Sequence, residues 1–188
     1  MKSLLTVTLA LLISIGTSAN SHLDHKLELA FLDAAAILEK PGACSEFFGG
    51  SKSTHVLNEL AVRLQTRTND YRTAFRMSGQ FVVHRNDSGV LYRLFDNAEV
   101  NRTGAFYKAK VFPSEPLVPN VGRFRPNTRE ARVLILLHEL AHLIEGSDGN
   151  WLIPDDGNDP QLSRSNTRTI EDKCREEIIT NSEISKHE

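Results

Sequence analysis

Apolar residues recur every three or four positions in three stretches outside the middle of the chain, which is the spacing of an amphipathic helix. The first runs from His22 to Lys40, the second from about Thr54 to Gln65, and the third from Pro160 to Ser182. Pro41-Gly42 directly follows the first stretch, as expected where a helix stops. The pattern therefore predicts helices towards both ends of the chain.

Between residues 79 and 112 the pattern changes to short runs of β-branched and aromatic residues. The runs cover residues 80–84, 89–95 and 106–112, and turn-forming residues separate them. Such runs are typical of antiparallel strands joined by tight turns. We expect the third run, Phe106 to Phe112, to offer a strand edge to which an extended peptide can add.

One further helix is expected from Asn127 or Thr128 to about Glu145, with Gly146 ending it. Glu130 stands three residues after Asn127, which is the spacing of a capping box. Residues 135–144 are apolar nearly all round the helix, so this element should be buried. The sequence thus predicts an α+β fold, with a small antiparallel or mixed sheet packed beside a buried helix and helices at both ends.

The buried helix carries the pattern His138-Glu139-Leu-Ala-His142. Residues four apart lie on one face of a helix, so the two imidazoles converge and can hold one metal ion. Glu139 is rotated by about 100° from His138, where it can reach a water on the ion but is poorly placed to bind the ion itself. Glu139 is therefore the candidate general base.

Burying two histidines and a glutamate in an apolar helix costs free energy unless a strong partner satisfies them. A metal ion supplies that partner. The alternative is a structural or vestigial histidine pair that holds no ion. In that alternative the carboxylate beside the first histidine has no purpose, whereas hydrolysis requires one.

Residues 1–19 read as a secretory signal peptide. Lys2 precedes an apolar run from Leu4 to Ile15, and small residues follow, so cleavage is expected near Ala19. Residues 20–188 are then a single mature domain, long enough to bury its own core. We expect the mature protein to be secreted or otherwise extracytoplasmic.

The charge of the chain does not indicate a particular binding partner. The formal net charge is −2, and no basic stripe indicates nucleic-acid binding. No second long apolar stretch follows the signal peptide, so we expect no membrane association after its cleavage. The sequence leaves the oligomeric state open.

The two cysteines, Cys44 and Cys174, lie near opposite ends of the mature chain. An even number of cysteines in an exported protein suggests a disulfide. Such a bond would tie the N-terminal region to the last helix. The alternative is a pair of buried thiols.

Strands followed by a capped apolar helix bearing His138-Glu139-Leu-Ala-His142 resemble the zincin metallopeptidases. The resemblance implies a small sheet beside the active-site helix and one Zn²⁺ per chain. It also implies that His138 and His142 are zinc ligands and that Glu139 is the catalytic base and proton shuttle.

The family requires a third zinc ligand, and here the chain departs from the familiar subclasses. Asp156, in a Pro-Asp-Asp-Gly turn that can form a rigid carboxylate platform, is our first candidate. Asp148 is the runner-up, because it occupies the last position of a partial metzincin-like extension. Glu171 on the final helix is a third possibility. Glu145, on the same helical face as His138, is more simply a solvated last-turn carboxylate.

The function implied is a secreted zinc peptidase that hydrolyses peptide bonds of peptide or protein substrates with a zinc-bound water and Glu139. Tyr107 or Arg123 are candidate oxyanion donors. Asn166 and Thr167 lie where they can hydrogen-bond a ligand, although plain packing of short polar residues is the simpler interpretation. The alternative is a secreted, disulfide-bridged binding or structural protein with a non-catalytic or vestigial metal site.

Overall fold

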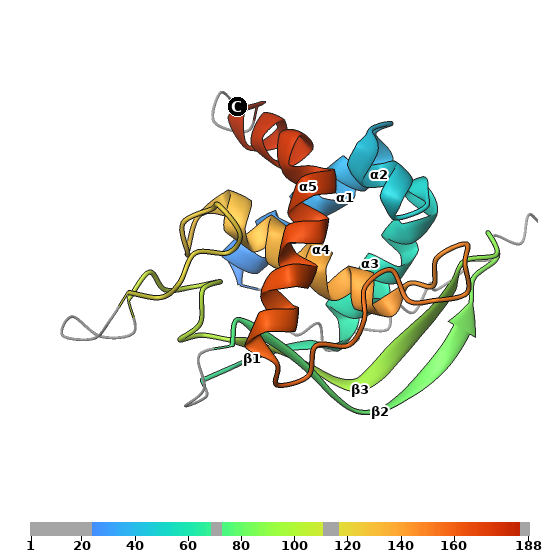
Figure 1. Cartoon of the computed structure of the whole chain (residues 1–188), viewed down its shortest axis with the longest axis horizontal. Coiled ribbons are helices and arrows are strands. Elements are labelled where there is room, and N and C mark those ends of the chain that lie inside the picture. The colour runs from blue at the N-terminus through green and yellow to red at the C-terminus, as the bar shows by residue number, and fades with distance from the viewer. Residues whose placement is uncertain (1–23, 69–72, 111–116, 185–188) are drawn as a thin grey trace, which may run out of the picture.

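The computed structural model describes residues 24–68, 73–110 and 117–184. The expected signal peptide lies outside the described residues. The helices are α1 His25–Glu39, α2 Ala43–Phe47, the 3₁₀ turn η1 Gly50–Ser53, α3 Thr54–Arg63, α4 Arg129–Leu143 and α5 Pro160–Ile184. The strands are β1 Leu64–Arg67, β2 Phe75–Arg85 and β3 Leu91–Asn101. Figure 1 shows a curved sheet along one side of the helices, with α5 crossing in front of α4.

The sheet is small and mixed, in the order β1-β3-β2. β2 and β3 form a long antiparallel hairpin that pairs Phe81 with Phe95 and Val83 with Arg93. β1 pairs in parallel with the end of β3, starting with Leu64 opposite Ala98. The predicted α+β fold, with a small sheet and helices at both ends, is therefore confirmed.

Two details of the sheet differ from the prediction. The short strand β1, directly after α3, was not expected at all. The expected strand from Phe106 to Phe112 does not form: residues 106–109 make turns, Lys110 makes a single isolated bridge to Leu117, and residues 111–112 lie outside the described residues. The side chain of Phe106 is fully buried, and its carbonyl accepts a hydrogen bond from Arg132 at the start of α4. Because this segment forms turns and its carbonyl at Phe106 bonds the helix, it does not offer a strand edge to which a peptide could add.

α4 lies in the core, and most of its residues are buried. Thr128 caps its first turn by accepting a hydrogen bond from the backbone N–H of Ala131. The backbone N–H of Asn127, which a capping box would join to Glu130, instead donates to the carbonyl of Ala105, and the Glu130 carboxylate accepts from Ser182 on α5. The helix ends at Leu143, two residues before the predicted end, since Ile144 is extended and pairs with Tyr92 of β3.

α5 packs against α4 and is fixed at its start and near its middle. Asp159 caps its start, accepting hydrogen bonds from the backbone N–H groups of Gln161 and Leu162. Further along, Cys174 forms a disulfide with Cys44 of α2. The predicted disulfide is therefore present, and it is consistent with an extracytoplasmic protein.

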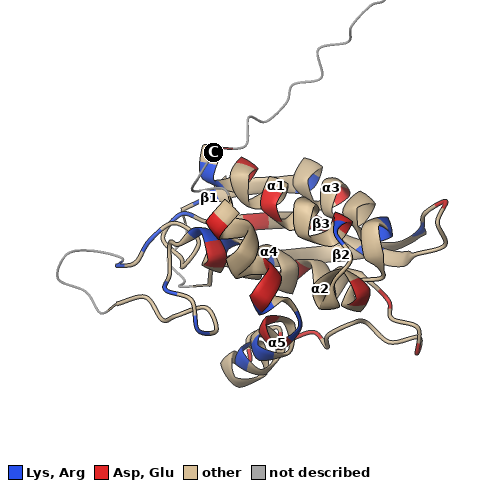
Figure 2. Cartoon of the chain, turned by 90° about the horizontal axis from the view of Figure 1, so that it is seen from above, with Lys and Arg blue, Asp and Glu red and all other residues tan. Residues whose placement is uncertain are grey.

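Among the described residues, no helix is both long enough and apolar enough to cross a membrane. Figure 2 shows acidic and basic residues interspersed along the helices on the side that it presents. Within α4, every residue from Val133 to Leu143 is buried except Glu139, which is half-buried.

Candidate metal centre

Two buried imidazoles face each other on one side of α4. His138 and His142 are only 6% and 4% exposed, and their Nε2 atoms lie 3.2 Å apart. The separation of four residues in the helix produces this approach, as the sequence predicts. Two unprotonated ring nitrogens at this distance repel each other, so the pair needs a proton or a cation between them.

Asp156 completes the group. Its Oδ2 lies 3.2 Å from Nε2 of His138, and its Oδ1 lies 3.6 Å from Nε2 of His142. A tetrahedral zinc ion with bonds of about 2.0–2.1 Å holds its ligand atoms roughly 3.3 Å apart. Two imidazole nitrogens and one carboxylate oxygen are also a donor set that zinc commonly takes. The structure thus brings together the three residues that the sequence ranked first, in a geometry that fits a metal ion.

Thr167 of α5 determines which nitrogen of His138 carries the proton. The Thr167 hydroxyl donates its only hydrogen to the carbonyl of Ser163, at 2.9 Å, and its oxygen lies 3.1 Å from Nδ1 of His138. The hydroxyl must therefore accept from an Nδ1–H group. In the neutral imidazole the lone pair is then on Nε2, which faces the cluster and can bind a metal ion, whereas without an ion a proton on this nitrogen makes the hydrogen bond to Asp156.

Arg93 of β3 fixes the turn that presents Asp156. Its side chain is only 2% exposed, and both terminal nitrogens donate to the carboxylate of Asp155, the neighbour of Asp156. Its Nε donates to the backbone carbonyl of His142 at 2.8 Å. One guanidinium therefore connects the end of α4 to the Asp155-Asp156 turn, using the planar, directed donors that lysine lacks.

Two further contacts hold the same turn. Asn166 of α5 donates to the carbonyl of Pro154 at 2.8 Å. The ring of Trp151 stacks on the guanidinium of Arg93, 4.3 Å from the ring centre. Thr167 thus hydrogen-bonds a candidate ligand directly, whereas Asn166 bonds only the backbone of the turn before Asp156.

Asp156 and His142 shift each other's pKa values towards their charged forms. Burial alone would raise the pKa of Asp156, but hydrogen bonds to His138 and His142 hold the pKa of this carboxyl well below its ordinary value. Burial would lower the pKa of His142, yet the hydrogen bond and charge of Asp156, with the charge of Glu139, raise it overall. Asp156 therefore stays ionised, and the site favours a positive charge between its three side chains.

Nδ1 of His142 is a buried nitrogen without a hydrogen-bond partner among the described residues. The closest carboxylate oxygen, Oδ1 of Asp155, is 3.9 Å away, which is too far for a hydrogen bond. Its Nε2 faces the cluster. Only Nδ1 thus lacks a partner among the described residues, while Nε2 of His142 faces His138 and Asp156 at the position where a bound cation would lie.

Glu139 lies beside the cluster without belonging to it. The three candidate ligands are His138, His142 and Asp156, and Glu139 is not one of them. Burial raises the pKa of the Glu139 carboxyl, and the nearby histidines oppose this shift. A carboxylate of raised pKa next to a metal group is well suited to accept and return a proton.

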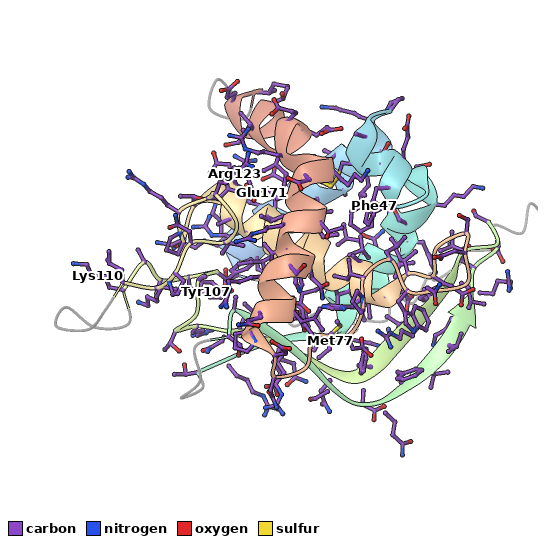
Figure 3. The ribbon with its side chains drawn as sticks, viewed as in Figure 1. Phe47, Met77, Tyr107, Lys110, Arg123 and Glu171 are labelled. Atoms are coloured by element: carbon purple, nitrogen blue, oxygen red, sulfur yellow. A yellow bond between two sulfur atoms is a disulfide. The ribbon has the colours of Figure 1, made fainter. Side chains whose placement is uncertain are left out.

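The other candidate ligands lie elsewhere. Asp148 is exposed and binds the backbone and side chain of Asn150. The buried Glu171 accepts from the backbone N–H of Arg123 at 3.0 Å, and Figure 3 shows these two residues side by side along α5. Glu145 pairs with Trp151 through the backbone. None of these three carboxylates belongs to the His138–His142–Asp156 group.

The two candidate oxyanion donors are engaged in other contacts. The hydroxyl of Tyr107 donates to Asp24, the N-cap of α1, and burial together with this bond raises the pKa of Tyr107. The backbone N–H of Arg123 donates to Glu171, and Figure 3 shows Tyr107 apart from these two residues. No described contact joins either residue to the cluster.

Neither Arg93 nor its contact with Asp155 was predicted from the sequence. Arg93 is the lone charge in the apolar run Val90-Leu-Tyr-Arg-Leu-Phe95. A buried arginine must find a carboxylate or carbonyl partner. A charged residue inside an apolar strand pattern therefore indicates a buried ion pair, but the sequence does not show which carboxylate Arg93 contacts.

Removing Asp156 should weaken metal binding far more than removing Asp148. We expect Asp156→Ala to lower zinc affinity by more than the about 10- to 100-fold that is typical for residues that only orient a ligand. Asp148→Ala, the matched control, should leave affinity within about twofold, because this carboxylate binds only Asn150. Competition titration with a chromogenic zinc chelator measures both. Equal losses in the two variants would contradict the assignment of Asp156.

Replacing Arg93 should also weaken metal binding, though less. Arg93→Met frees the Asp155-Asp156 turn from α4, and we expect a loss of about 10- to 100-fold in zinc affinity. Arg93→Lys keeps the charge but not the directed bonds, so its loss should be intermediate. Arg63→Met, which breaks a half-exposed pair with Glu59, is the control. Unchanged zinc affinity in a folded Arg93→Met variant would show that this arginine does not position the turn.

Comparison with known proteins finds no matching protein-family model, no matching curated protein and no matching solved structure.

Proposed function

We propose that this protein is a secreted zinc-dependent peptidase. The observation that carries the proposal is the convergence of His138, His142 and Asp156, with the carboxylate of Glu139 close enough to interact electrostatically with all three. Three protein ligands leave a zinc ion an open position, which is the arrangement of catalytic rather than structural zinc sites.

In this proposal the residues in and around the cluster have different roles. When bound, a zinc ion would lower the pKa of a water molecule and polarise a substrate carbonyl. His138, His142 and Asp156 would hold the ion, and Thr167 and Arg93 keep His138 and the Asp156 turn in place. Glu139 would take the proton of the attacking water and return it to the leaving amine.

The choice of a peptide bond as substrate rests on the resemblance of the His138-Glu139-Leu-Ala-His142 helix to zincins. The signal-like residues 1–19 and the Cys44–Cys174 disulfide together support export from the cytoplasm. The zinc identity is supported by the nitrogen and carboxylate donors and by their separations.

The deciding experiment combines metal analysis with a cleavage assay on the purified mature chain. We expect about one zinc per chain in the wild type, lost in His142→Ala, together with cleavage of casein that a chelator abolishes and added zinc restores. Zinc without cleavage of casein or of a mixed peptide library would contradict the peptidase and favour the disulfide-bridged binding protein. A wild-type protein that takes up no zinc after reloading would contradict the metal site itself.

A further inference from the structure

A groove of about 590 Å³ lies at the far end of α4, beyond His142. Its apolar wall comes from three separate parts of the chain: α2, the tip of the hairpin and the loop after α4. The half-buried apolar residues that line it are Phe47, Val90, Leu91, Trp151 and Leu152. Figure 3 labels Phe47 where α2 approaches the loop after α4. Apolar side chains left half-open to solvent in one concave site are typical of a binding surface.

Three carboxylates surround this apolar wall. Glu46, Glu145 and Asp148 line the groove, and the only basic residue there is Arg85. Among the described residues, none of the three has an ion-pair partner within 4.0 Å, while the Arg85 side chain donates to the carbonyl of Gly89. Hydrogen bonds from Asn150 hold the pKa of Asp148 below its ordinary value, so this carboxylate is ionised at neutral pH. The groove is therefore apolar within and negative at its rim.

Trp151 links the groove by contact to the residues around the candidate metal centre. The Trp151 ring lines the groove and also stacks on Arg93. Arg93 holds Asp155, the neighbour of Asp156. Ile144 and Glu145, which line the groove, follow His142 by two and three residues along the chain.

We propose that this groove binds an extended peptide segment in which apolar and basic side chains alternate. The apolar wall takes the apolar side chains, and the unpaired carboxylates at the rim attract the basic ones and exclude acidic ones. Identifying the segment as the flank of a substrate rests on the proposed peptidase function, whereas the binding itself does not.

The chain offers a direct probe, because Trp151 is its only tryptophan. The experiment follows Trp151 fluorescence in the mature wild-type protein, as purified and after chelation, during titration with an acetylated, amidated hexapeptide of alternating leucine and lysine. We expect a saturable change in emission in both samples. A leucine–glutamate peptide and a serine–lysine peptide should each bind at least about tenfold more weakly, since each lacks one of the two features.

A pair of charge-matched variants tests the rim. Glu145→Gln with Asp148→Asn should weaken the leucine–lysine peptide by about tenfold and leave the leucine–glutamate peptide unchanged or slightly tighter. Asp172→Asn with Glu183→Gln, the same charge change on exposed positions of α5, should change neither. No emission change up to millimolar peptide, or equal binding of the basic and acidic peptides, would overturn the proposal.

The outcomes also separate the groove from the peptidase. An emission change in a protein that binds no zinc and cleaves nothing would leave the groove established and the peptidase refuted. Zinc-dependent cleavage without any response of Trp151 would support the peptidase and refute peptide binding in the groove.

Discussion

Glu139→Gln is expected to lower the rate of peptide cleavage by about 10²- to 10⁴-fold while leaving zinc bound. The glutamine side chain keeps the shape of glutamate but cannot accept a proton. Glu139 is not one of the three candidate ligands, so its replacement should leave zinc affinity within a few-fold of the wild type. The loss should therefore appear in kcat with little change in zinc content.

The measurement is kcat and KM on a quenched fluorescent peptide, with zinc content determined on the same samples. Glu28→Gln, which makes the same chemical change at an exposed position of α1, is the control and should retain wild-type activity. A Glu139→Gln variant that keeps its rate within tenfold would remove Glu139 from the mechanism. One that loses its zinc would instead make Glu139 part of the metal site.

The second large effect concerns stability. Replacing Cys44 and Cys174 together by serine should lower the free energy of unfolding by about 4–5 kcal/mol. The bond closes a loop with a sequence separation of 130 residues, so its loss greatly increases the freedom of the unfolded chain. Both cysteines are fully buried, so the double variant also replaces two apolar sulfurs in the core by polar hydroxyls, which lowers its stability further.

Urea unfolding of the oxidised wild type and of the double variant measures this difference. The matched comparison is the wild type under reductant, which should unfold near the double variant, while the variant itself should be insensitive to reductant. Because Thr167 and Asn166 lie about two turns before Cys174 on α5, the variant should also bind zinc more weakly. A difference below about 1 kcal/mol would show that packing between α2 and α5 suffices without the bond.

The strand that failed to appear at Phe106–Phe112 shows where local pattern misleads. Aromatic and β-branched residues favour a strand, but Phe106 is buried against the start of α4, and its carbonyl is taken by Arg132. β1 was missed for the converse reason. Its four residues, Leu64 to Arg67, continue directly from α3 and become a strand only by pairing with the end of β3.

The sequence by itself determined the parts of this protein that depend on neighbours along the chain. His138 and His142 face each other because they are four residues apart on one helix, and Glu139 lies beside them for the same reason. The caps of α4 and α5 and the apolar character of α4 are equally local. Such features follow from helix geometry, whatever the rest of the fold does.

Only the tertiary structure decided how the two histidines are completed. Asp156, Thr167 and Arg93 come from a loop, from α5 and from β3, and no spacing along the chain relates them to α4. The carboxylates of Asp148 and Glu171 were equally available in the sequence, and contacts with Asn150 and Arg123 place them elsewhere. The choice among them rests on packing and on satisfying buried charges, which are properties of the whole fold.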